Sequence, residues 1–314
     1  MGGSGEGLCF CHTWNREKSR EVNGLSFLNN LITGISLGSV YAIIALGYTM
    51  VYGIAKMLNF AHGDVIMVGA YVTFFATGSF NLPPVVGVLL SVVVCTVLGV
   101  VIEGLAYRPL RQASSLAVLI TAIGVSYFLQ NAALLLWGAD TKVFTPVVPS
   151  GSLPIEGVTI TYASLITVLA CIVIMLALTW FTSKTKMGKA MRACSEDKAA
   201  AQLMGINVNR TISMTFAIGS ALAAIAGVLL CSNYQTLMPT TGSLPGIKAF
   251  TAAVFGGIGS IPGAMLGGIL LGIIEIFAKA FNTNISDAVV FAVLIVVLLV
   301  KPTGLLGKAV REKV

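Results

Sequence analysis

The apolar stretches of this sequence contain few residues able to do chemistry, and three of them, Asn59, His62 and Asp64, stand within six positions. An imidazole beside a carboxylate can bind a polar solute or carry a proton, and ionisable groups among apolar segments are costly enough to indicate function. The same residues also fit a helix start at the inner edge of a membrane, where Asp64 would interact favourably with the helix dipole. Capping and contact with a solute both remain open.

Two glutamates also lie inside apolar runs. Glu103 is followed about one helical turn later by Arg108, so we expect an ion pair between them. Glu275 precedes Lys279 by four residues, a spacing that places both side chains on one face of a helix. We interpret both as structural pairs, and a position of Glu275 on a conduction path is the alternative.

No set of residues suggests catalysis. The chain lacks the Gly-x-x-x-x-Gly-Lys-Ser/Thr loop that binds ATP and the His-Glu-x-x-His zinc motif. Cys9, Cys11 and His12 resemble part of a metal site, yet no second ligand pair accompanies them. We therefore predict no enzymatic activity, no metal site and no cofactor bound by this chain.

The composition indicates what surrounds these residues. Hydrophobic residues make up 56% of the 314 positions, charged residues only 10%, and the mean hydropathy is +0.93. A soluble domain has roughly 25% charged residues, so most of this surface must face lipid. The sequence predicts an all-α integral membrane protein, a polytopic helical bundle of eight or nine spans. Its apolar runs cover about 25–46, 65–80, 85–106, 116–137, 162–181, 212–231, 247–258, 264–281 and 288–300.

The distribution of lysine and arginine predicts the orientation. Loops rich in these residues stay in the cytoplasm, which places 182–211 and the C-terminal end inside, and 138–161 and 232–246 outside. The net charge of +7 is concentrated in such loops, so it does not indicate nucleic-acid binding. Counting back from Arg108 places the N-terminus outside, unless an additional crossing lies within 46–62.

Three regions follow from this pattern. Residues 1–24 form a polar, Gly-rich tail, of which residues 1–21 are foreign to the native chain if translation starts at Val22. Residues 25–302 form the membrane domain, including a cytoplasmic loop at 183–210, and residues 303–314 form a basic cytoplasmic tail. No connection between the spans is long enough for a second folded domain.

Two segments, 52–64 and 255–263, interrupt the helical pattern in the two halves of the chain. Their glycines and proline free backbone groups, which a membrane tolerates only where protein or a water-filled path covers them. Such a pair points to a transport site between internal repeats, although these two segments do not align with each other. The candidate residues of a translocation path are Asn59, His62, Gly63, Asp64, Gly256, Gly257, Gly259 and Pro262.

Small residues at four-residue spacing predict close helix packing. The pattern occurs as Gly263-x-x-x-Gly267 and as Gly268-x-x-x-Gly272. Glycine at this spacing lets two helix backbones approach each other. The contact can lie within this chain or with a partner subunit.

The cytoplasmic loop 183–210 is far longer than a connection between two spans requires. Its second part, from Glu196 to Gly205, predicts a short helix that ends at the glycine. A helical element kept in the cytoplasm indicates a docking site for a cytoplasmic partner. A solvated basic loop is the alternative.

Five motifs stand in order along about 22–308: Asn30 to Ala42, Asn59 to Asp64, Tyr107 to Arg111 with Thr121 to Gly124, Gly188 to Gly205 with Arg210, and Phe255 to Ala264. Together they resemble the LivH-type permeases, which are membrane subunits of ABC importers for branched-chain amino acids. The resemblance implies the ABC importer permease fold and a place in the bacterial plasma (inner) membrane. It implies branched-chain or related amino acids as substrates. The substrate class is kept wide because members of the family that look alike also carry other amino acids or urea.

The resemblance also implies partners. Such a permease assembles with a second homologous permease, two cytoplasmic subunits that bind ATP and magnesium, and an extracytoplasmic solute-binding protein. The loop would supply the coupling helix, with Glu196, Asp197, Ala200, Ala201 and Gly205 as its contacts. Ala199 departs from the importer pattern Glu-Ala-Ala-x-x-x-Gly, in which that position is acidic.

The implied mechanism is alternating access driven by the partner ATPases. A secondary transporter driven by an ion gradient is the alternative. It would explain Asp64 and the interrupted segments but would not need the long cytoplasmic loop.

Overall fold

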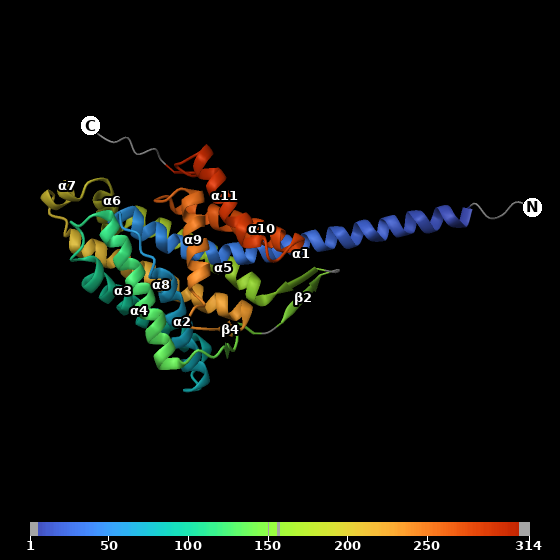
Figure 1. Cartoon of the computed structure of the whole chain (residues 1–314), viewed down its shortest axis with the longest axis horizontal. Coiled ribbons are helices and arrows are strands. Elements are labelled where there is room, and N and C mark those ends of the chain that lie inside the picture. The colour runs from blue at the N-terminus through green and yellow to red at the C-terminus, as the bar shows by residue number, and fades with distance from the viewer. Residues whose placement is uncertain (1–5, 150, 156–157, 308–314) are drawn as a thin grey trace, which may run out of the picture.

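The computed structural model describes residues 6–149, 151–155 and 158–307 (Figure 1). Its helices pack into one bundle, which confirms the predicted all-α membrane fold. Two antiparallel strand pairs join β1 (Lys142–Val143) to β4 (Thr236–Leu237) and β2 (Ser152–Ile155) to β3 (Val158–Thr161). The helices are α1 (Glu6–Ala55), α2 (His62–Gly78), α3 (Pro84–Ile102), the π-helical turn η1 (Glu103–Tyr107), α4 (Ser115–Trp137), α5 (Tyr162–Lys184), α6 (Lys186–Glu196), α7 (Lys198–Leu203), α8 (Val208–Tyr234), α9 (Ser243–Gly256), α10 (Ile261–Phe281) and α11 (Ser286–Val300).

Six helical stretches in the described part of the chain are long and apolar enough to cross a membrane. They are Ser26–Ala55 within α1, Pro84–Tyr107 across α3 and η1, and the whole of α4, α5, α8 and α10. The runs expected at 65–80, 247–258 and 288–300 form α2, α9 and α11, which have 17, 14 and 15 residues. At 1.5 Å per residue these helices are shorter than a hydrocarbon core of about 30 Å. The predicted eight or nine crossings are therefore not confirmed.

The first helix differs from its prediction at both ends. α1 is one continuous helix of 50 residues from Glu6 to Ala55, so the backbone of 6–24, predicted as a tail, extends the first span. Figure 1 shows this N-terminal part projecting from the bundle. The suggestion of an additional crossing within 46–62 is wrong, because residues 46–55 belong to α1 and residues 56–61 form only a short connection to α2.

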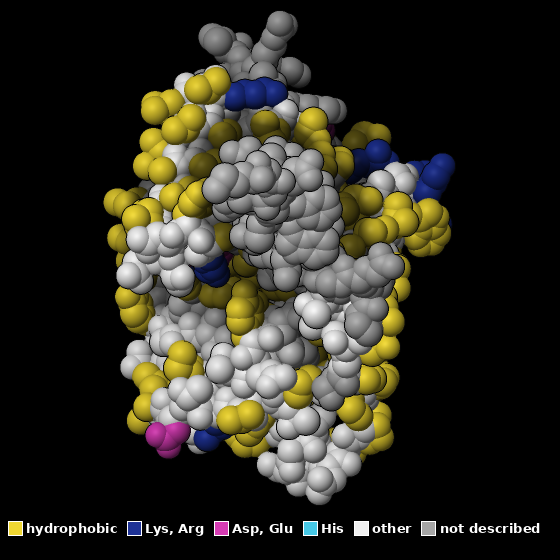
Figure 2. All heavy atoms as spheres, turned by 90° about the vertical axis from the view of Figure 1, so that its right-hand side faces the viewer, with side chains coloured by type: hydrophobic (Ala, Val, Ile, Leu, Met, Phe, Trp, Pro, Cys, Tyr) yellow, Lys and Arg dark blue, Asp and Glu magenta, His cyan; other side chains and the backbone are white. Residues whose placement is uncertain are grey.

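The centre of the bundle is formed by α1 and α8. In each, 78% of the most apolar window is buried, whereas the corresponding share is 17% in α4 and in α5. The exposed side chains of α4 and α5 are mostly large and apolar, as expected for helices that face lipid or another membrane subunit. Hydrophobic side chains also gather along both flanks of the face seen in Figure 2, where charged side chains are few.

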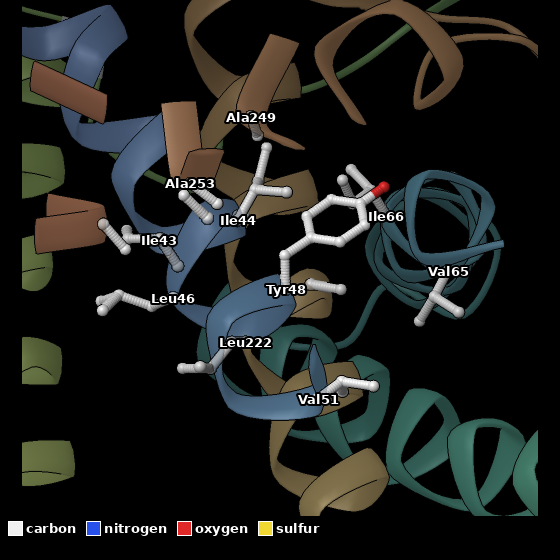
Figure 3. Close-up of a cluster of buried hydrophobic side chains, with 14 of the residues drawn as sticks. Ile43, Ile44, Leu46, Tyr48, Val51, Val65, Ile66, Leu222, Ala249 and Ala253 are labelled. Atoms are coloured by element: carbon white, nitrogen blue, oxygen red, sulfur yellow. The ribbon is translucent and has the colours of Figure 1, made fainter. Parts of the chain in front are cut away.

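Large aliphatic side chains of α1 fill the interior. Figure 3 shows Ile43, Ile44 and Leu46 pointing to several neighbouring helices, and the ring of Tyr48 extending from α1 toward α2. Residues from α2, α8 and α9, including Ile66, Leu222 and Ala253, complete the cluster. The side chains of Ile43, Ile44 and Leu46 are fully buried, so α1 positions the elements around it.

The glycine motifs pack helices within this chain. A Cβ on Gly268 would lie 2.5 Å from Ala42 Cα of α1, and one on Gly38 would lie 2.7 Å from Ile269 Cα of α10. Gly263 and Gly267 make equally close approaches to α9. The contacts of α10 with α1 and α9 therefore involve Gly38, Gly263, Gly267 and Gly268. The alternative of a contact with a partner subunit is not needed to explain these glycines.

The chain returns to the bundle after α11. The amide groups of Leu305 and Leu306 donate hydrogen bonds of 2.9 and 3.0 Å to the carbonyl groups of Phe255 and Gly256, at the end of α9. They satisfy carbonyl groups that the end of a helix leaves unpaired. Residues 303–307 of the predicted tail are therefore part of the packed structure, and 308–314 lie outside the described residues.

Candidate functional site

The first interrupted segment turns back into the bundle. α1 ends at Ala55, and α2 begins at His62, beside Gly47 of α1. A Cβ on Gly47 would lie 2.5 Å from His62 Nε2 and 3.3 Å from the carbonyl oxygen of Gly219 in α8. Gly47 precedes Ala55 by eight residues, which is about 12 Å along a helix. α2 therefore starts beside the interior of α1 rather than beside its end, and Asp64 lies in the first turn of α2, as expected for a helix start.

Asp64 is a buried carboxylate held by neutral groups from distant segments. It is 1% exposed, and its Oδ1 accepts a hydrogen bond of 2.9 Å from Gln130 Nε2 of α4. The same amide nitrogen lies 3.2 Å from Ser126 Oγ and 3.1 Å from Ser243 Oγ at the start of α9. Among the described residues, Asp64 forms no ion pair. A carboxylate in this setting can bind a cationic group such as an ammonium.

Glycines bring the starts of α2 and α9 together next to Asp64. A Cβ on Gly63 would lie 2.6 Å from the Gly242 carbonyl oxygen, and one on Gly246 would lie 2.9 Å from Gly63 Cα. A side chain at Gly63 would push α9 away and with it Ser243. The sequence singled out Gly63 for interrupting a helix, and the structure assigns it a close approach between two helix starts.

Asn59 and His62 have different surroundings. Asn59 is 4% exposed, and its Oδ1 accepts a hydrogen bond of 2.9 Å from Tyr107 Oη. The His62 ring lies against Tyr48, with 4.6 Å between ring centroids, and its Nε2 is buried without a hydrogen-bond partner in the described structure. A buried polar atom without a partner is uncommon and costs stability.

The second interrupted segment connects α9 to α10. Gly257 and Gly259 adopt φ angles of 105° and 97°, which side chains other than glycine rarely permit. Ser260 Oγ then accepts a hydrogen bond of 3.3 Å from the Gly263 amide at the start of α10, where Pro262 occupies the first turn. Gly256 packs against the backbone of Gly263. The glycines thus allow a sharp connection between two closely packed helices.

The two interrupted segments lie side by side. A Cβ on Gly53, near the end of α1, would lie 3.4 Å from Gly259 Cα. A narrow pocket between them is lined by Met57, Leu58 and Asn59 from the first segment and by Ile258 from the second. Tyr48, Val51, Tyr52, Phe250 and Ala253 complete its wall. The structure therefore brings together both segments that the sequence predicted to line a path.

Glu275 belongs to a larger cluster of charges. Lys279 Nζ lies 2.6 Å from Glu275 Oε1, as the spacing predicts, but Lys248 of α9 lies 2.8 Å from the same oxygen. Lys248 also contacts Asp287 Oδ1 of α11 at 2.6 Å, and Tyr41 Oη of α1 donates to Glu275 Oε2 at 2.9 Å. The two lysines balance the two carboxylates, so this cluster connects four helices without a net charge.

The expected pair between Glu103 and Arg108 is not formed. Glu103 instead forms an ion pair with Arg111, and it accepts a hydrogen bond of 2.6 Å from Ser213 Oγ of α8. Residues 103–107 form a π-helical turn, in which the Arg108 amide bonds to the Glu103 carbonyl, and Arg108 is exposed. The wider turn and the bend after it bring Arg111 to Glu103, and this could not be read from an α-helical spacing.

The loop at 183–210 forms the short helix that the sequence predicted. Asp197 caps α7 by accepting hydrogen bonds of 2.8 and 3.0 Å from the amides of Ala199 and Ala200. Gly205, with φ of 82°, ends it, because its amide bonds to the Gln202 carbonyl and the Ile206 amide bonds to the Ala201 carbonyl. These paired bonds are the Schellman motif.

The loop presents an apolar tip beyond these caps. Leu203 and Met204 are 88% and 83% exposed, although both are large and apolar. Glu196, Asp197 and Ala200 are also exposed, whereas Ala201 is buried against α1 and α6. Exposed apolar side chains on a rigid turn are typical of a surface that binds another protein.

Sequence reasoning missed several residues of these clusters. Lys248 was detectable as an ionisable residue within the apolar run 247–258. Gln130, Ser243 and Asp287 carried no such signal, because single polar residues at these positions are common near helix ends and in spans. Their importance comes only from the contacts they make with Asp64 and Lys248.

Comparison with known proteins places these features in a family. The family described as branched-chain amino acid transport system / permease component matches residues 30–298. The high-affinity branched-chain amino acid transport system permease protein BraD of Pseudomonas aeruginosa is 47% identical over 301 residues, which cover 92% of this chain and 98% of BraD. LivH of Escherichia coli (strain K12), with the same description, is 47% identical over 304 residues, with the same coverage. The probable branched-chain amino acid transport permease protein LivH of Methanocaldococcus jannaschii is 29% identical and covers 87% of this chain.

The match extends across the interrupted segments, the charge cluster and the loop at 183–210, since all of them lie within residues 30–298. The relatives are transport permease proteins rather than enzymes, as predicted for this chain. The candidate spans agree with a multi-pass protein of the inner membrane. The chain therefore belongs to the family of branched-chain amino acid ABC transport permeases.

Proposed function

We propose that this chain is the membrane-spanning permease subunit of an ATP-driven importer for branched-chain or related amino acids. The observation that carries the proposal is the 47% identity to LivH and BraD over nearly their whole length. The complex would contain a second homologous permease, two cytoplasmic subunits that bind ATP and magnesium, and an extracytoplasmic solute-binding protein. This chain would bind no cofactor itself.

The proposed path passes the Asp64 cluster and the two interrupted segments. A branched-chain amino acid has an ammonium group that a buried carboxylate can bind and an apolar side chain that suits the neighbouring wall. Asp64 is closed off in the present conformation, with 1% of its surface exposed. Alternating access requires such a state, in which the path is sealed before the helices separate.

The proposed coupling element is the loop that carries α7. The tip formed by Leu203, Met204 and Gly205 would insert into a groove on an ATPase subunit, since its two large apolar side chains are exposed among the described residues. Asp197 and the Schellman motif keep the tip rigid. ATP-driven closure of the ATPases would then move the loop against the membrane helices.

The coupling role predicts the effect of a large charged side chain at the tip. Gly205→Glu is expected to abolish leucine uptake, because a carboxylate would enter an apolar interface and because φ of 82° strains any side chain. Membrane insertion should persist, since none of the described residues places an atom within 4 Å of a Cβ at this position. Uptake of radiolabelled leucine and retention of the ATPases on a tagged permease would both be measured.

Gly205→Ala is the matched control. It adds the same backbone strain, about 1 kcal/mol, without bulk or charge, so most of the uptake should remain. Normal uptake by Gly205→Glu would rule out this tip as the coupling contact. Recovery of the wild-type chain alone, without ATPases or a second permease, would instead favour a carrier driven by an ion gradient.

The path also predicts a role for the charge on Asp64. Asp64→Asn should leave the fold intact, because the asparagine oxygen can still accept from Gln130, but uptake should fall about tenfold. A hydrogen bond to a charged group contributes about 1.5–3 kcal/mol, and 1.4 kcal/mol corresponds to a factor of ten. Asp140→Asn, which removes a charge from an exposed outer loop, serves as the control. Equal uptake by the two variants would place the substrate away from Asp64.

A further inference from the structure

One hydrogen bond connects the cytoplasmic loop directly to the end of α1. Lys198, the first residue of α7, donates from Nζ to the carbonyl oxygen of Ala55 at 2.7 Å. Ala55 is the last residue of α1, and the two residues are 143 positions apart. The last carbonyl groups of a helix lack partners within the helix, and a lysine is favourable there because it faces the negative end of the dipole.

This bond is held at both ends by rigid structure. On the loop side, the Asp197 carboxylate accepts hydrogen bonds from the Ala199 and Ala200 amides and so fixes the start of α7 around Lys198. On the α1 side, Lys56 takes the left-handed conformation, with φ of 58°, and its amide bonds to the Tyr52 carbonyl at 2.9 Å. The helix therefore ends sharply at the residue that Lys198 contacts.

An apolar cluster supports the same contact. Met50 and Ile54 from the last turns of α1 pack with Met191 and Cys194 of α6 and with Ala201 of α7. Ile261, the first residue of α10, packs against this cluster as well. The loop thus packs against the last turns of α1, in an apolar cluster that the first residue of α10 also joins.

The position of Lys198 is costly for a charged group. Burial, together with the positive charges of Arg111 and Lys56, lowers the pKa of Lys198. Among the described residues, Lys198 forms no ion pair with a carboxylate. The bond to Ala55 and the dipole of α1 are therefore the interactions that offset this cost.

We propose that Lys198 is a positioning residue that transmits movement of the coupling loop to the end of α1 and to residues 56–61. Those residues contain Asn59 and lead to His62 and Asp64, so a shift of Ala55 changes the segment that seals the path. The proposal rests on the proposed function for the role of the loop. A contact of this kind couples two sites when it is made in one conformation and lost or rearranged in the other.

The first test measures the contact itself and does not depend on transport. The full chain is placed in lipid nanodiscs, and amide hydrogen exchange is followed for residues 55–62. Lys198→Met keeps the length of the side chain but removes its donor, so exchange in this segment should accelerate about tenfold. Lys198→Arg, which can still donate to a carbonyl, should remain near the wild-type rate. Unchanged exchange in Lys198→Met would overturn the proposal.

The second test measures coupling in the assembled transporter. The complex with its partner permease, ATPases and binding protein is reconstituted in liposomes. The measured quantity is the ratio of leucine molecules taken up to ATP molecules hydrolysed. Lys198→Met should lower this ratio about tenfold, within the usual range for coupled sites, while the ATPases still co-purify. Lys198→Arg should restore most of the ratio. Lys189→Met, which removes an exposed lysine of α6, should leave it unchanged.

The outcomes separate this inference from the proposed function. An unchanged ratio in Lys198→Met would overturn the inference alone. Loss of the ATPases from that variant would also overturn it, because Lys198 would then act in docking. If the wild-type complex takes up no leucine with its binding protein, the proposed function fails, while the exchange measurement still decides whether Lys198 holds the end of α1.

Discussion

Gly272→Leu is expected to lower the free energy of unfolding by more than about 3 kcal/mol. This is the largest loss of stability expected among the variants described. A Cβ on Gly272 would overlap the backbone of Gly38 and lie 2.7 Å from the carbonyl oxygen of Gly34. Overpacking of a well-filled interior usually costs 1–3 kcal/mol, and it costs more when backbone must move. Here two whole helices, α1 and α10, would have to separate, because no flexible side chain lies between them.

This effect can be measured on protein purified in a mild detergent. The readout is the temperature, or the concentration of sodium dodecyl sulfate, at which half of the protein is unfolded. Gly272→Ala should already show a clear loss, since the Cβ alone creates the overlap. Gly124→Ala in α4 is the matched control, because no atom lies within 4 Å of a Cβ there and alanine is the better helix former. Equal stability of Gly272→Leu and the wild type would show that α1 and α10 do not pack in this way.

Lys248→Met is expected to cost about 3 kcal/mol, because it takes a buried cation away from the buried carboxylate of Glu275 and from Asp287. Lys248 is 4% exposed and bridges Glu275 and Asp287, at 2.8 and 2.6 Å. Removing one partner of a buried ion pair typically costs 3–5 kcal/mol. Lys279 still faces Glu275 after the change, so the loss should lie at the lower end of that range.

Lys279→Met provides a control within the same cluster. The side chain of Lys279 is 32% exposed, so solvent screens its pairing with Glu275 and the cost should stay below about 1 kcal/mol. The double change Lys248→Met with Glu275→Gln should recover part of the loss, because it also removes the buried charge that has lost one of its two lysine partners. Both comparisons use the same thermal measurement in detergent. Similar losses for Lys248→Met and Lys279→Met would contradict the central position of Lys248.

The geometry separates positions where mutations are expected to affect transport from positions where they are expected to affect folding. Asp64, Gly205 and Lys198 lie at contacts that can change during a cycle, whereas Gly272 and Lys248 hold helices together in one arrangement. Variants of the first group should insert and assemble normally but lose uptake. In variants of the second group, the amount of folded protein should fall, and uptake should fall only as a result.

The sequence by itself determined the class of structure. Few charged residues and long apolar runs predict helices in lipid. Each helix satisfies its own backbone hydrogen-bonding groups, and its outward side chains need only be apolar, as the surrounding hydrocarbon is. The end of α7 at Gly205 was also predictable, since a left-handed residue is a local requirement. The pair between Glu275 and Lys279 follows from helical spacing in the same way.

The tertiary structure decided which distant residues meet. Gln130 reaches Asp64 across 66 positions, and Lys198 reaches Ala55 across 143. Glu103 contacts Arg111 instead of Arg108, because a π-helical turn changes the direction of the chain. Hydropathy and spacing act along one helix, whereas these contacts depend on how glycines such as Gly63 and Gly272 let separate backbones approach. That packing also placed the start of α2 inside the bundle, where the position of Asp64 follows from the fold alone.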